Sequence, residues 1–206
     1  MISSRHYVRA KIEDSYLFMQ QLINMFMQME QLYEENMMKM FANTAEEVSK
    51  GDKEVEHSIK SQFQAIYNNS QDNKNIFYQA MLIMVYSYYE TYAQLMCNEL
   101  GVNKKAKENS VDSIFRHNNI IIPEHIRENK RLLYRDVREL RNFIVHNKSE
   151  KHKDLQDEAI KRLKKVHPEI VYDGEEIAIT GANCVMDFLT KEYEVLKYLC
   201  TAVGFN

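Results

Sequence analysis

The stretch that decides the fold is NKRLLYRDVRELRNFIVH, residues 129–146. Four of its apolar residues recur at intervals of four, three and four positions: Leu133, Val137, Leu140 and Ile144. This spacing predicts an amphipathic helix with a single apolar stripe that faces the core.

The opposite side of the same predicted helix is polar. At about 100° per residue, Arg141, Asn142 and His146 fall within an arc of about 140° facing away from the stripe. Tyr134, Arg135 and Arg138 point into or beside this arc. A helix face with arginines, one amide and one histidine indicates a contact with something other than the core.

The arrangement Arg141-Asn142, three residues, then His146 resembles the Arg-[Asn/Asp/His]-x-x-x-His signature of HEPN domains (higher eukaryotes and prokaryotes nucleotide-binding). These are small all-α domains, and many are metal-independent endoribonucleases of toxin–antitoxin, abortive-infection and CRISPR-associated systems. The resemblance implies a four-helix architecture with the motif on the third main helix. It also implies that two copies dimerise through this helix and form one composite cleft.

Cleavage of RNA without a metal requires proton transfer and compensation of the charge on the phosphorane. A histidine transfers protons near neutral pH, and an arginine is a permanent, forked donor to phosphate oxygens. By resemblance, Arg141 stabilises the transition state, His146 is the acid–base group and Asn142 orients them. The implied products are a 2′,3′-cyclic phosphate and a 5′-hydroxyl.

Glu90 stands among tyrosines in the most hydrophobic part of the chain. A buried glutamate needs a partner, and a cation from the Arg141/His146 helix is the natural candidate. HEPN domains are similar here, since their second main helix often carries an acidic residue facing the motif. The alternative is that Glu90 simply reaches solvent beside the tyrosines.

The net charge of −3 excludes a globally basic nucleic-acid binder. Residues 127–165, however, carry 13 Lys and Arg against 7 Asp and Glu, a net of +6. This local excess predicts a surface for a polyanion, with Arg138, Arg135 and Lys148 as RNA-binding residues. The alternative is an ordinary solvated charged surface.

With 206 residues, 5 Gly and 2 Pro, the composition predicts one all-α domain over residues 1–206. No signal peptide is visible, and the longest apolar run is too short to span a bilayer, so we expect a cytoplasmic protein without a membrane partner. The three cysteines (Cys97, Cys184 and Cys200) are interpreted as reduced core thiols.

Periodicity predicts a long first helix from Tyr7 to about Phe41 and a shorter one from Asp52 to about residue 66. The next helix runs from about Asn75 to Leu100, after a break at 68–73, and Gly101 ends it. Short helices follow around 111–115 and 155–166. A β-hairpin is expected over 169–180 on an Asp-Gly turn, before a last helix over 183–200.

No phosphate-binding loop, zinc motif or nucleophile elbow is present, so neither a cofactor nor a metal is expected. Some HEPN toxins have a tyrosine two residues after the histidine, where this chain has Lys148, which argues against regulation by modification of such a tyrosine. The function indicated is a dimeric endoribonuclease of a toxin or phage-defence system, with a cognate antitoxin or regulatory protein as a further partner. The alternative is a non-catalytic HEPN-like module that binds RNA, a nucleotide or a partner protein.

Overall fold

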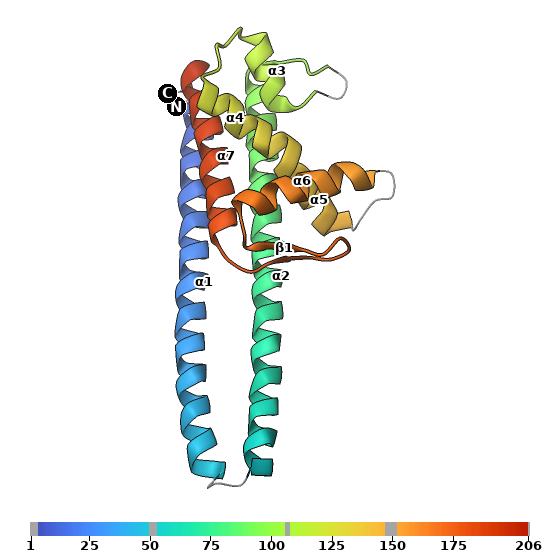
Figure 1. Ribbon diagram of the computed structural model, residues 1–206. Coiled ribbons are helices and arrows are strands. Elements are labelled where there is room, and N and C mark those ends of the chain that lie inside the picture. Colours follow the sequence, from blue (N-terminus) through green and yellow to red (C-terminus); the bar gives the residue numbers. More distant parts are fainter. Residues whose placement is uncertain (1–3, 50–52, 106–107, 147–151, 206) are drawn as a thin grey trace.

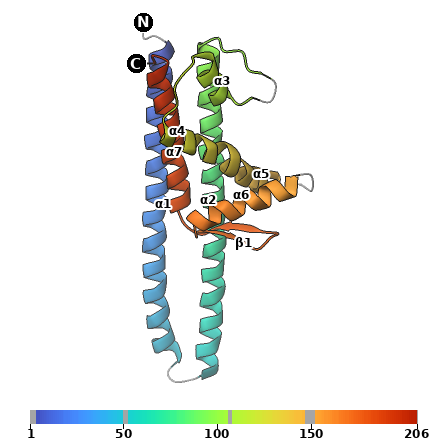
Figure 2. The same ribbon diagram turned by 45° about the horizontal axis from the view of Figure 1, so that its top comes forward.

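The computed structural model describes residues 4–49, 53–105, 108–146 and 152–205. Two long antiparallel helices, α1 (Ser4–Ser49) and α2 (Lys53–Glu99), run side by side along the whole molecule (Figures 1 and 2). At 1.5 Å per residue each is about 70 Å long. The remaining elements gather around one half of this helix pair, the half that contains the start of α1 and the end of α2.

Short helices and a β-hairpin separate α2 from the last helix, α7 (Asn183–Ala202). The helices are α3 (Ser110–His117), α4 (Glu124–Leu132), a π turn η1 (Leu133–Val137), α5 (Arg138–His146) and α6 (Lys153–Val166). The strands are β1 (Ile170–Tyr172) and β2 (Ile177–Ile179). The predictions of an all-helical class, a long first helix and a hairpin before the last helix are confirmed.

The core lies where α1, α2 and α7 meet and the α4–η1–α5 helix crosses them. Tyr16 of α1 stacks on Tyr193 of α7, with ring centroids 4.1 Å apart. On α2, Leu82, Val85 and Met96 are fully buried. The three cysteines are buried and unpaired, as expected for core thiols.

The predicted break at 68–73 is wrong, because α2 is one continuous helix. Polar residues cost less than about 1 kcal/mol each in a helix interior, and packing overrides so small a preference. Here that packing is provided by α1: Phe77 of α2 stacks on Phe26, and Lys74 pairs with Glu30 and Glu34. The first helix also extends beyond the expected end, to Ser49, while Asp52 lies outside the described residues.

The β-hairpin has the predicted position and turn. Its strands pair antiparallel in the register Ile170 to Ile179. At the turn, Asp173 Oδ1 accepts hydrogen bonds of 2.8 Å from the backbone N–H groups of Glu175 and Glu176, and Gly174 has a positive φ of 109°. Ile179 N–H donates to Asn75 Oδ1 at 2.8 Å, which fixes the hairpin to α2.

Beyond this hairpin, residues 30–49 of α1 and 53–74 of α2 project as a two-helix arm (Figure 1). A partly buried ionic cluster holds its base. The Lys74 ammonium contacts Glu30 and Glu34, and Tyr78 Oη donates to Glu30 Oε2 at 2.6 Å. The Lys74 side chain is only 9% exposed, whereas Glu34 is 41% exposed.

Lys74→Met should therefore destabilise the protein by about 3 kcal/mol, because the half-buried Glu30 carboxylate loses its cation. Glu34→Ala should cost less than about 1 kcal/mol, as expected for an exposed ion pair. Urea unfolding of both variants measures the difference, and equal losses would contradict this assignment.

Candidate functional site

The motif helix begins directly after Pro123 and continues through α4, η1 and α5 without a break. The predicted start at Asn129 is thus five residues late. Within η1 the Arg138 N–H bonds to the Leu133 carbonyl, the five-residue spacing of a π turn. Such a turn inserts one extra residue and rotates the following residues relative to those before it.

Asp136 anchors this π turn, although its side chain is only 2% exposed. Arg135 donates to it through Nε and Nη2, both at 2.8 Å, and Arg162 of α6 donates through Nη2 at 2.8 Å. Burial raises the pKa of Asp136, but hydrogen bonds from Arg135 and Arg162 outweigh it and leave the pKa below the ordinary value. Arg135, predicted to bind RNA, thus forms an intramolecular ion pair.

Arg141 and Asn142 lie together on α5, and both are half-buried. Arg141 Nη1 donates to Asn142 Oδ1 at 3.1 Å, while the buried Arg141 Nε has no hydrogen-bond partner. Within the described ranges no carboxylate forms an ion pair with Arg141 or Arg138. By contrast, Arg116, Arg127 and Arg162 are each paired with a carboxylate.

His146 is the last residue of α5 and is exposed to solvent. It follows Asn142 by four residues, about one helical turn. The polar arc predicted from the sequence therefore divides into two half-buried residues, Arg141 and Asn142, and one exposed histidine. Lys148, predicted to bind RNA, lies outside the described residues.

Arg138 continues the same face one turn before Arg141. Its guanidinium lies over the Tyr134 ring, 5.1 Å from the centroid. Tyr134 in turn lines a cavity of about 580 Å³ with Tyr86 and Glu90 of α2. The cavity is thus lined mainly by α2, and Arg138 of α5 is next to it through the Tyr134 ring.

Glu90 is exposed at this cavity. In the part of the chain that the structure describes, it forms no ion pair with a residue of α5. Its placement matches the alternative of a carboxylate that reaches solvent beside tyrosines. Burial raises the pKa of Tyr86 above its ordinary value, and the negative charge of Glu90 adds to this increase.

Glu192 of α7, not identified from the sequence, is a buried carboxyl in this region. It is 2% exposed, and its Oε1 has no hydrogen-bond partner. Burial, together with the charge of Glu90, raises the pKa of Glu192 well above its ordinary value. The sequence did contain a signal for this burial. Glu192 follows Phe188 by four residues and precedes Leu199 by seven, which places it on the inward face of the last helix.

Neither protein-family models nor comparisons with curated proteins and with solved structures yield a match to this chain. Over the described ranges, no three side chains of His, Cys, Asp or Glu lie close enough to hold a metal ion. None of the helices described is both long and apolar enough to cross a bilayer.

The Asp136 ion pairs predict an acid-sensitive contribution to stability. Because the folded-state pKa is lowered, the contribution is fully present above the unfolded pKa of about 4 and is lost as the pH falls through the folded value. Asp136→Asn should be less stable than the parent at pH 7, and this deficit should shrink towards pH 3. Unfolding free energies at both pH values measure it, and a deficit that does not change with pH would contradict the prediction.

Glu192 predicts the opposite dependence. Its raised pKa means that ionisation in the unfolded chain costs stability as the pH rises above about 4. Glu192→Gln should therefore stabilise the protein at pH 7 by about 1 kcal/mol or more, with little effect at pH 4. Thermal unfolding at the two pH values tests this, and destabilisation at pH 7 would show that the carboxylate is needed.

Proposed function

We propose that this protein is a metal-independent endoribonuclease of the HEPN type that cleaves single-stranded RNA as a toxin or phage-defence effector. One observation carries the proposal. Arg141, hydrogen-bonded to Asn142, has no carboxylate partner in the described part of the chain, and His146 is exposed one turn further on. An arginine without a carboxylate retains its charge for a phosphate.

The chemistry requires a base at the attacking 2′-hydroxyl and an acid at the leaving 5′-oxygen. His146 serves one of these roles, because an imidazole both accepts and donates protons near neutral pH. The attack forms a 2′-O–P bond and breaks the bond to the 5′-oxygen, so the products are a 2′,3′-cyclic phosphate and a 5′-hydroxyl. Arg141 compensates the added negative charge on the phosphorane, and Asn142 holds its guanidinium in place.

A second copy supplies the second histidine. Each chain has one Arg141 and one His146, so a homodimer formed through α5 brings two of each to a composite cleft. Arg138, whose guanidinium covers the Tyr134 ring and has no carboxylate partner within the described ranges, lies beside this cleft and contacts the RNA backbone. The net charge of +6 in the sequence of residues 127–165 supports a polyanion as the partner.

Incubation of the protein with labelled single-stranded RNA in excess EDTA tests the proposal. The parent should cleave and leave cyclic-phosphate ends. His146→Ala and Arg141→Ala should each reduce the rate at least about 100-fold, the usual loss for an acid–base group or a charge-stabilising donor.

Two matched controls lie on the same helix. His125 is an exposed histidine, and Arg127 is an exposed arginine paired with Glu124. Their alanine variants should retain activity. Equal cleavage by all variants, or cleavage only with added metal, would contradict the proposal; RNA binding without cleavage would instead favour the non-catalytic module.

A further inference from the structure

The middle of α1 is uncharged yet exposed. Between Asp14 and Glu30 the chain carries fifteen residues, 15–29, without one charged side chain. Large apolar side chains here and just beyond are nevertheless solvent-exposed: Phe18 by 57%, Met25 by 53%, Met29 by 59% and Leu32 by 60%. An exposed apolar surface of this size on a helix indicates a binding surface.

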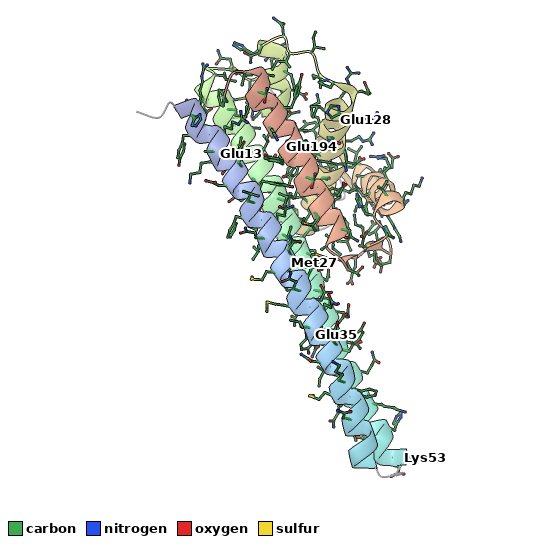
Figure 3. The ribbon with its side chains drawn as sticks, turned by 90° about the vertical axis from the view of Figure 1, so that its left-hand side faces the viewer. Glu13, Met27, Glu35, Lys53, Glu128 and Glu194 are labelled. Carbon is green, nitrogen blue, oxygen red and sulfur yellow. The ribbon has the colours of Figure 1, made fainter. Side chains whose placement is uncertain are left out.

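These side chains form a second stripe on α1. The inner stripe, Ile12, Tyr16, Met19, Ile23 and Phe26, packs against α2 and α7. The outer stripe is defined as Phe18, Leu22, Met25, Met29 and Leu32. On an ideal helix its members span about 80° and are centred about 120° from the inner stripe. In Figure 3, α1 lies in front from Glu13 to Glu35, with the other elements behind or beside it.

The outer stripe has the spacing of a helix-pairing seam, with Met25 at its middle position. Its intervals are four, three, four and three residues, the coiled-coil pattern. If two copies pack antiparallel about Met25, then Phe18 of one copy faces Leu32 of the other, and Leu22 lies beside Met29. We propose that the outer stripe of α1 is a homodimer interface in which two copies of α1 pack antiparallel around Met25.

Charge favours this antiparallel arrangement. Asp14 and Lys39 are both exposed and lie within about 20° of each other on one edge of the stripe. In an antiparallel pair, residues on the same edge of the two helices approach each other. Asp14 of each copy therefore lies near Lys39 of the other. Between these two ion pairs, the charged residues Glu30, Glu34 and Glu35 lie about 100° or more from the centre of the outer stripe, so the packed faces bury no charge.

The exposed area reaches the lower limit for a specific protein interface. Phe18, Met25, Met29 and Leu32 each expose more than half of their surface, roughly 100 Å² per side chain. Two copies, with the partly buried Leu22 and the flanking Tyr33 of α1, which is 45% exposed, reach roughly 1,000 Å². This is the lower range for specific protein interfaces.

This interface is separate from the one proposed on α5. The outer stripe lies on α1, whereas α5 packs against α2 and α6. A chain that uses both surfaces forms an assembly larger than a dimer. A substitution at Met25 should remove the α1 interface and leave the α5 surface unchanged. Failure of the α1 interface can therefore be distinguished from failure of the proposed α5 cleft.

Light scattering of the purified full chain tests the proposal. The parent should have at least twice the mass of the 24.5 kDa chain, and Met25→Glu should halve the observed mass by placing two carboxylates against each other. Val166→Glu, at a 70% exposed apolar residue of α6, is the matched control and should leave the mass unchanged. A monomeric parent, or a Met25→Glu variant with the mass of the parent, would overturn the proposal.

Oxidative cross-linking tests the direction of packing. Phe18→Cys combined with Leu32→Cys should give a covalent dimer, whereas each single substitution should not. The two positions are about 21 Å apart within one helix, so they cannot cross-link internally, and the native cysteines are buried. Cross-linking of the single variants, as parallel helices would give, or none by the double variant, would refute the antiparallel interface.

Discussion

The burial of α2 on several sides is the constraint on which the rest of the structure depends. This helix contacts α1, α3, α5, α7 and β2, so most other elements take their position from it. Its buried residues between Tyr78 and Cys97 are almost all apolar or aromatic. Because a helix that is apolar on most sides must be enclosed, α7 and the α4–η1–α5 helix pack around it. Tyr134 of η1 thereby lines a cavity together with residues of α2.

Electrostatic pairing divides the basic residues of this region into two groups. Arg135 and Arg162 are held by the buried Asp136 and stabilise the π turn. Arg138 and Arg141, on the face that follows this turn, contact a tyrosine ring and an amide instead of a carboxylate. Within the described residues, the buried acid thus pairs with Arg135 and Arg162, whereas Arg138 and Arg141 have no carboxylate partner, an arrangement suited to binding an anion.

The sequence predicted most helices, the hairpin turn and the helical position of the motif, because each has a strong local signal in periodicity or turn chemistry. It did not predict the continuity of α2, where packing of Lys74 and Phe77 against α1 overrides weak local preferences. The π turn has no periodic signature, so the half-burial of Arg141 could not be predicted. Glu192 was missed because the apolar residues around it alone were used to define the inward face of the last helix. Whether Glu90 pairs with a cation of α5 depends on the distance between two helices, which periodicity does not give.

The proposed mechanism is that the α5 face cleaves RNA through attack by the 2′-hydroxyl. The most direct measurement compares one RNA sequence with its 2′-O-methyl counterpart, both incubated with the protein in EDTA. The proposed mechanism predicts cleavage of the unmodified RNA, with 2′,3′-cyclic phosphate ends, and no cleavage of the methylated strand, which lacks the nucleophile. Equal cleavage of both strands, or 3′-hydroxyl ends, would contradict it.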